Sequence, residues 1–476
     1  MQSTYKRQDN TPIAAWRRLT SVLREAVKGS NQDFTQGSIS RSIFLLAVPM
    51  ILEMCMESLF GVVDVFFVAR LGADAVAVVG ITESLLTLVF AVALGLSMAT
   101  TAIVARRTGE KKPEEAALAT AQSIGIAVAV SLPIGLVAIA CSKPIFRLMG
   151  ASPAVETTGA TYAAIVLGSN TTVMLLFVIN AAFRGAGDAA VAMRALWVAN
   201  IINMILDPCL IFGPGPFPAM GVTGAAVATS IGRGVGVGYQ LYVLVWGRSR
   251  IRITRRQLAI HYESMSHILR VSVGGMFQYF IATASWLGLI RIVAVFGDAA
   301  LAGYTIAIRI IVFAILPSWG LSNAAATMVG QNLGAGNPSR AEQSVWLTAV
   351  SNMLFLGCVT VLFVLGAEPL IGMFTSEPDV ISAGVSCLRY VSYGYVFYAY
   401  GMVMVQAFNG AGDTLTPTII NLCCYWLFQI PLSYWLATRA RLGANGVFIA
   451  IAVSESALAT VGLLIFRRGA WKRRLV

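Results

Sequence analysis

The sequence contains two copies of one unit, related by a shift of 225 positions. The hexapeptide FRGAGD at Phe183–Asp188 returns as FNGAGD at Phe408–Asp413. The same shift carries Leu71, Gly72, Ala75 and Ala77 onto Phe296, Gly297, Ala300 and Ala302, and carries Gly109, Pro113 and Ala116 onto Gly334, Pro338 and Ala341. Three matches at one offset are hard to obtain by chance, so the chain is interpreted as a tandem duplication.

Charge-free apolar runs long enough to cross a bilayer recur in both copies. The 476-residue chain is 57% hydrophobic and 12% charged, with a mean hydropathy of +0.76, which excludes an ordinary soluble protein. We expect an all-α membrane protein with twelve transmembrane helices, six in each copy. Because six is even, each copy starts and ends on the same side. Two six-helix bundles related by a pseudo-two-fold axis along the membrane normal are therefore predicted.

Basic residues between the apolar runs set the expected orientation. Most of the 34 Lys and Arg fall on one side, which the positive-inside rule assigns to the cytoplasm. This explains the net charge of +12 without a nucleic-acid partner. We predict a multi-pass protein of the cell inner membrane with both termini cytoplasmic. The expected parts are a tail at 1–40, an N-lobe at 41–247 (spans 1–6), a basic linker at 248–264, a C-lobe at 265–466 (spans 7–12) and a basic C-terminus at 467–476.

The tail itself allows two interpretations. Apolar residues recur at helical spacing from Ile13 to Val27, with basic residues between them. This pattern fits an interfacial helix on the anionic inner leaflet, and a disordered tail remains the alternative.

The first span carries three carboxylates, although a charge at bilayer depth costs about 2.5 to 3.5 kcal/mol on the mildest scale. Glu53, Glu57 and Asp64 are separated by four and seven residues, so they share one helix face. Acids in spans usually face a cavity and mark an ion or substrate path. Pro49 lies on the same helix and should bend its axis.

The two copies differ most in such acids. The shift of 225 places Leu289 at the position of Asp64, so cation coupling is predicted for the N-terminal half. On the fifth span Asn203 and Asp207 share a face, and Thr229 on the sixth span offers a hydroxyl. These four side chains could share a proton or ligate a Na⁺ ion.

The predicted substrate cavity combines acids with aromatic and amide side chains. On the fourth span Tyr162 and Asn180 are 18 residues apart and are expected on one face, either as cavity wall or as helix contacts. Gln278 on the seventh span and Tyr398 on the Tyr-rich tenth span are candidates in the second copy. Aromatic faces and thioethers suit flat, lipophilic cations.

Enzyme chemistry is not expected. The seven Cys show no metal-binding spacing, and both His lie outside the spans. No nucleotide motif and no cofactor site is recognised. Asp64 is assigned to coupling, and Glu53 and Glu57 are expected to contact substrate, with a part in coupling as the alternative.

With these residues in hand, the chain resembles the multidrug and toxic compound extrusion (MATE) transporters over nearly its whole length after residue 40. The resemblance rests on the paired FxGAGD loops, the VD of the first span, the GxxxPxxA partners, LDP in the fifth span and the Gly-rich entry to the sixth. It looks closest to the branch with DNA-damage-inducible and archaeal members. Another branch keeps acids in the seventh and tenth spans, which this sequence lacks.

The resemblance implies an efflux pump of twelve spans that exchanges organic cations for H⁺ or Na⁺ by rocking two lobes. It places the cation site at Asp64, Asn203, Asp207 and Thr229, cavity positions at Glu57, Tyr162 and Asn180, and the bending proline at Pro49. We expect a monomer that uses the bilayer and lipophilic cationic substrates as its partners, with H⁺ or Na⁺ as coupling ion. The alternative is an exporter or flippase of lipid-linked or polar metabolites from the same superfamily.

Overall fold

The computed structural model describes residues 12–30, 32–247 and 249–474, and within these ranges the regular elements are all helices. The first half consists of α1 (Pro12–Lys28), α2 (Ile39–Ala69), α3 (Ala73–Gly109), α4 (Pro113–Leu148), α5 (Pro153–Gly168), α6 (Asn170–Ala186), α7 (Ala189–Phe212), α8 (Val222–Trp246) and η1 (Arg255–Leu258). The second half consists of α9 (Tyr262–Ala294), α10 (Asp298–Gly334), α11 (Pro338–Gly372), α12 (Pro378–Tyr393), α13 (Tyr395–Gly410), α14 (Leu415–Asn421), η2 (Leu422–Gln429), α15 (Ile430–Tyr434), η3 (Trp435–Arg439), α16 (Ala444–Arg467) and η4 (Ala470–Arg473). We call α2–α8 the N-lobe and α9–α16 the C-lobe.

The predicted span count is confirmed. Ten helical segments in the described ranges are long and apolar enough to cross a membrane, with α5–α6 and α14–η3 each counted as one segment. The 25-residue α8 and the pair α12–α13 complete six crossings in each lobe.

Helix boundaries follow the sequence repeat. Adding 225 to Ala73–Gly109 gives 298–334, the range of α10, and adding it to Pro153–Gly168 gives 378–393, the range of α12. A proline occupies the first turn of α4, α5, α11 and α12, where a missing N–H costs no helical hydrogen bond. The same local signals therefore start the same helices in both lobes.

The repeated FxGAGD motif is a helix-ending turn. Gly187 and Gly412 adopt φ of 89° and 81°, a left-handed conformation that favours glycine. The N–H groups of Asp188 and Asp413 then donate to the carbonyls of Phe183 and Phe408 at 2.8 and 2.9 Å. The motif thus closes α6 and α13 tightly, as predicted for a connection between spans.

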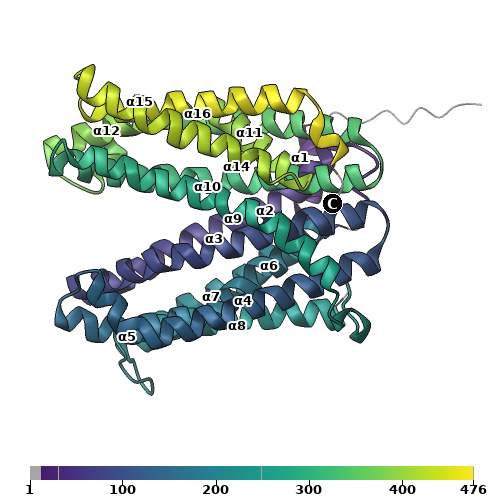
Figure 1. Ribbon diagram of the computed structural model, residues 1–476, viewed down its shortest axis with the longest axis horizontal. Coiled ribbons are helices and arrows are strands. Elements are labelled where there is room, and N and C mark those ends of the chain that lie inside the picture. Colours follow the sequence, from purple (N-terminus) through teal and green to yellow (C-terminus); the bar gives the residue numbers. More distant parts are fainter. Residues whose placement is uncertain (1–11, 31, 248, 475–476) are drawn as a thin grey trace, which may run out of the picture.

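The two lobes form a V (Figure 1). They meet at one end, where a Cβ on Gly109 would lie 2.0 Å from the Gln331 carbonyl oxygen and one on Gly334 would lie 2.2 Å from that of Arg106. We call this the closed end. The ribbons diverge toward the opposite end, and α1 and the C-terminus both lie at the closed end (Figure 1).

The chain between α1 and α2 packs across the closed end. Phe34 is 1% exposed and shares a hydrophobic cluster with Leu46 of α2 and Met328 of α10. Arg340 of the C-lobe donates to the carbonyls of Phe34, Gln36 and Gly37 at 3.3, 2.9 and 2.8 Å. Part of the predicted tail is therefore an ordered contact between lobes, and residues 1–11 of it lie outside the described ranges.

Candidate functional site

A buried polar cluster lies inside the N-lobe between α7 and α8. Asn203 Nδ2 donates to Asp207 Oδ1 at 3.2 Å and to Thr229 Oγ1 at 3.1 Å. Asp207 is completely buried and Asn203 is 2% exposed. The four-residue spacing of Asn203 and Asp207 places both on one face of α7. Three of the four residues predicted for cation coupling are therefore in direct contact.

Asp64 of α2 faces this cluster. Its carboxylate is within electrostatic range of Asp207, and Glu83 and Arg233 lie within range of Asp64. One oxygen each of Asp64, Asn203 and Asp207 is buried without a hydrogen-bond partner among the described residues. Buried acceptors are normally paired, so three orphan oxygens in one lobe leave room for a proton or a cation.

The donor set is mixed. Within the described ranges no three His, Cys, Asp or Glu side chains stand together as a metal group. Carboxylate, amide and hydroxyl oxygens are hard ligands that suit Na⁺, and the carboxylates can also accept a proton. The cluster therefore fits either coupling ion.

Tyr162 lies within electrostatic range of this cluster. It is 6% exposed on α5, and the charges of Asp64 and Asp207 act on its hydroxyl. Asn180 lies in α6, about 27 Å further along the fourth span, because 18 residues rise about 1.5 Å each. The span is interrupted at Ser169, between α5 and α6, and the common face of Tyr162 and Asn180 stays a prediction.

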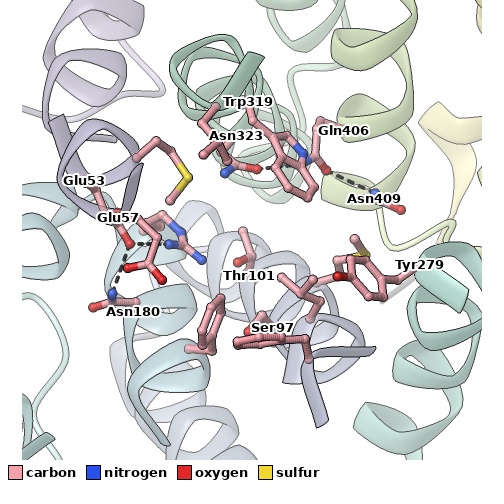
Figure 2. A pocket seen from close by; sticks show the side chains of 18 of the residues that line it. Glu53, Glu57, Ser97, Thr101, Asn180, Tyr279, Trp319, Asn323, Gln406 and Asn409 are labelled. Atoms are coloured by element: carbon pink, nitrogen blue, oxygen red, sulfur yellow. Dashed lines mark hydrogen bonds and ion pairs between the residues drawn. The ribbon is translucent and has the colours of Figure 1, made fainter. Parts of the chain in front are cut away.

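A second site is a cavity of about 310 Å³ between the lobes. From the N-lobe it is lined by Glu53 and Glu57 of α2 and by Asn180 and Arg184 of α6. From the C-lobe it is lined by Tyr279, Trp319, Asn323, Gln406 and Asn409, which face the acids across the space (Figure 2). We call it the central cavity.

Glu53 holds a hydrogen-bonded network at the cavity wall. Its Oε1 accepts from Arg184 Nη1 at 2.7 Å and from Asn180 Nδ2 at 3.0 Å (Figure 2). Asn180 Oδ1 in turn accepts from Gln240 Nε2 of α8 at 2.6 Å. Glu53 is 2% exposed, so its charge is desolvated and compensated by Arg184.

Glu57 is different. It lies one turn further along α2, beside Glu53 (Figure 2), and has no ion-pair partner among the described residues. The charged groups that line the central cavity are thus two carboxylates and one guanidinium. The excess charge of the cavity is negative and belongs to Glu57.

Gln278 and Tyr398 line a neighbouring cavity of about 200 Å³. This cavity shares Met98, Tyr279, Trp319 and Gln406 with the central cavity, so the two adjoin. The sequence prediction missed Met98, Trp319 and Gln406 and, above all, Arg184. The two copies of FxGAGD differ only at Arg184 and Asn409, and both line the central cavity. That single difference was the available signal.

Comparison with known proteins gives the same architecture. The MatE family profile matches residues 49–209 and 275–435, once in each lobe. A probable multidrug resistance protein NorM of Thermotoga maritima is 28% identical over 438 residues, covering 92% of this chain and 94% of that protein. An FAD transporter of Shewanella oneidensis is 23% identical over 418 residues, covering 88% and 92%.

A solved structure shares the fold closely. A MOP superfamily transporter from Pyrococcus furiosus, described as having a binding pocket of reversed polarity, superposes with a TM-score of 0.86 at 27% identity and covers 93% of this chain and 98% of its own. Members of this family are multi-pass membrane transporters and not enzymes. With both lobes matched by the family profile, the chain belongs to the MATE family of multidrug efflux transporters.

Proposed function

We propose that this protein exports lipophilic organic cations in exchange for H⁺ or Na⁺ by alternating access. The observation that carries the proposal is the pair of carboxylates, Asp64 and Asp207, each with a buried oxygen that lacks a hydrogen-bond partner among the described residues. An uncompensated carboxylate at membrane depth is costly, and binding a cation or a proton removes that cost.

The charge of the central cavity favours a cationic substrate. Arg184 is already neutralised by Glu53, while Glu57 is a free carboxylate among the described residues. Tyr279 and Trp319 line the cavity, and the faces of aromatic rings attract cations. A flat organic cation therefore finds both charge and apolar surface.

The alternative is an exporter of polar or lipid-linked metabolites. The amides of Asn323, Gln406 and Asn409 are linked by hydrogen bonds of 2.5 and 3.0 Å and could bind polar groups. The relative described as an FAD transporter is consistent with this alternative. An anionic substrate, however, would meet the unpaired charge of Glu57.

Coupling would run through α2. This helix carries Asp64 toward the N-lobe cluster and Glu57 toward the central cavity. A Cβ on Gly320 of α10 would lie 2.6 Å from the Met50 carbonyl oxygen, next to Pro49. A change in bend at Pro49 on ion uptake would therefore alter both the substrate contacts and the packing of α2 on the C-lobe.

The proposed orientation follows from the basic residues. With both termini in the cytoplasm of an inner-membrane monomer, the closed end is cytoplasmic and the V opens outward. In the predicted division, the N-lobe (41–247) and the C-lobe (265–466) act as two rocking bodies, and the basic linker (248–264, with residue 248 outside the described ranges) connects them. The helices α2 and α9 begin two and three residues before these predicted limits. This outward-open state would release substrate outside and take up the coupling ion.

Ethidium transport in energised membrane vesicles tests the proposal. The pH gradient and the Na⁺ gradient are dissipated in separate experiments. We expect transport to stop in one of them, and the gradient whose loss stops transport identifies the coupling ion. Asp64→Asn should abolish transport while the protein still inserts, and Glu368→Gln, which removes an exposed acid of α11, should not. Ethidium transport that survives loss of both gradients, or full transport by Asp64→Asn, would reject the exchange mechanism. Transport of FAD without ethidium would favour the alternative.

A further inference from the structure

The C-lobe contains a carboxylate that the N-lobe cluster and the central cavity do not use. Glu455 of α16 lines a cavity of about 220 Å³ within the C-lobe. It has no ion-pair partner among the described residues, where its one hydrogen bond comes from the Tyr425 hydroxyl, 3.4 Å from Oε2. This is a long hydrogen bond, and no Lys or Arg among the described residues pairs with the carboxyl group.

Aromatic side chains surround this carboxylate. The cavity is lined by Trp286, Tyr304, Tyr395, Tyr398 and Tyr425. Trp286 Nε1 donates to the Tyr304 hydroxyl at 2.9 Å, which fixes both rings. Tyr395 is 2% exposed, and its hydroxyl has no partner among the described residues. A carboxyl group and several aromatic side chains that line one cavity are the groups that recognise a quaternary ammonium ion.

The scaffold does not require these aromatics. Shifting the six positions back by 225 gives Gly61, Val79, Asn170, Val173, Asn200 and Ser230 in the N-lobe, with no aromatic and no acid among them. The N-lobe packs its own helices without such a group. The aromatic ring and Glu455 are therefore a specialisation of the C-lobe.

A local change in helix geometry accompanies this specialisation. Tyr425 lies in the π-helical segment η2 (Leu422–Gln429). The corresponding part of the N-lobe, residues 197–204, lies in the α-helical α7. Short π-helical segments are rare and occur frequently at functional sites. In this one the widened turn carries Tyr425 and Gln429 to the cavity wall.

The C-lobe cavity adjoins the substrate path. Tyr398, Tyr425 and Ala282 line both this cavity and the one of about 200 Å³, which in turn shares four wall residues with the central cavity. The three cavities are thus neighbours, and each shares wall residues with the next.

From these contacts we infer that the C-lobe cavity is a second binding site. It holds quaternary ammonium cations that carry a single aromatic ring, between Glu455 and the aromatic side chains of the cavity wall. The inference rests on the proposed function for the class of substrate. The C-lobe cavity has a volume of about 220 Å³, against about 310 Å³ for the central cavity, and therefore favours smaller cations than the central cavity admits.

Equilibrium dialysis of trimethylphenylammonium against the full chain in lipid nanodiscs tests this site. We expect two bound cations per chain. Glu455→Gln and Trp286→Leu should each weaken binding to the C-lobe cavity at least about tenfold. Glu57→Gln should instead weaken binding to the central cavity. Glu368→Gln is the matched control and should change binding to neither cavity. Retained binding to the other cavity shows that each variant is folded.

The neutral isostere tert-butylbenzene separates a cation site from a merely apolar cavity. It should bind the C-lobe less tightly than the ammonium ion, and Glu455→Gln should not weaken it. A single class of ammonium site that Glu455→Gln leaves unchanged, or equal binding of both probes, would overturn the inference. Two-site binding without ion-driven ethidium transport would keep this site and reject the exchange mechanism. Ion-driven ethidium transport by a protein with only one ammonium site would keep the exchange mechanism and reject the C-lobe site.

Discussion

Glu53 Oε1 lies 2.7 Å from Arg184 Nη1, and the shift of 225 carries this ion pair onto Gln278 and Asn409. Both charged members of this N-lobe ion pair are thus replaced by neutral amides at the matching C-lobe positions. A lone buried charge is far more costly than a paired one, so the two charges depend on each other. The central cavity is consequently asymmetric in charge although its two halves share one scaffold.

Breaking this pair should destabilise the protein. We expect Glu53→Gln or Arg184→Asn alone to lower the free energy of unfolding by about 3 to 5 kcal/mol, because each leaves one buried charge unpaired. The double variant, which recreates the amide pair of the C-lobe, should recover most of this loss. Unfolding of the purified protein in detergent measures all three.

Glu57→Gln is the matched control for that experiment. Glu57 lies one turn from Glu53 and has no ion-pair partner among the described residues. Its replacement should change unfolding little and ethidium binding strongly. Equal destabilisation by Glu57→Gln, or a double variant no more stable than the single ones, would contradict the coupling of Glu53 to Arg184.

The sequence predicted the helices and their limits well, because helix ends and membrane spans depend on residues that are close together in the sequence. Helix limits in α10 and α12 follow from those of α3 and α5, since the same proline and glycine signals occur at matching positions. The cluster of Asn203, Asp207 and Thr229 was also foreseeable, because spacing on α7 fixes the first two. Contacts within one helix or between sequential helices are readable from spacing.

Contacts that depend on a helix break or on distant helices were not readable in this way. Nothing in the spacing of Tyr162 and Asn180 shows that the helix stops at Ser169. The partnership of Glu53 with Arg184 joins α2 to α6 across 131 positions. Only the packed bundle shows that Arg184 neutralises Glu53 and leaves Glu57 as the free charge of the cavity.

Ion coupling at the N-lobe cluster should depend on the hydroxyl oxygen of Thr229 and not on the size of its side chain. Thr229→Val removes the hydroxyl that accepts from Asn203 at 3.1 Å and keeps the side-chain volume, so we expect ion-driven ethidium transport to fall about tenfold. Thr229→Ser keeps the hydroxyl and should retain most transport. Transport rates in vesicles at several ion concentrations provide the measurement. Equal rates for the two variants would show that the hydroxyl has no part in coupling.

Asp33 should make the contact across the closed end sensitive to acid. Burial raises the pKa of Asp33, but hydrogen bonds from Lys111 and Thr35 outweigh it and lower the pKa to about 2. A depressed pKa stabilises the folded contact above the ordinary value of about 4, and this stabilisation is lost as the pH falls toward 2. Protection of residues 32–38 from hydrogen exchange, corrected for the intrinsic rate, should therefore decrease between about pH 4 and pH 2.

Two variants check the origin of that change. Asp33→Asn should lower protection at neutral pH and remove the dependence on pH. Glu114→Gln alters an exposed acid at the same end of the molecule, whose contact to Arg256 is 3.8 Å, and should leave the profile as in the wild type. A profile unchanged by Asp33→Asn would assign the acid sensitivity to another group.

The glycine pair Gly109 and Gly334 should control closure of the V. A Cβ at either position would meet backbone atoms of the other lobe at 2.0 and 2.2 Å, so Gly109→Ala or Gly334→Ala must push α3 and α10 apart. We expect each to cost about 1 to 3 kcal/mol in the state closed at this end. Gly125→Ala and Gly357→Ala, where a Cβ meets nothing within 4 Å, should be neutral or stabilising. Distances between spin labels on the two lobes at this end should lengthen only in the first pair. Unchanged distances there would show that the lobes do not need this close backbone approach.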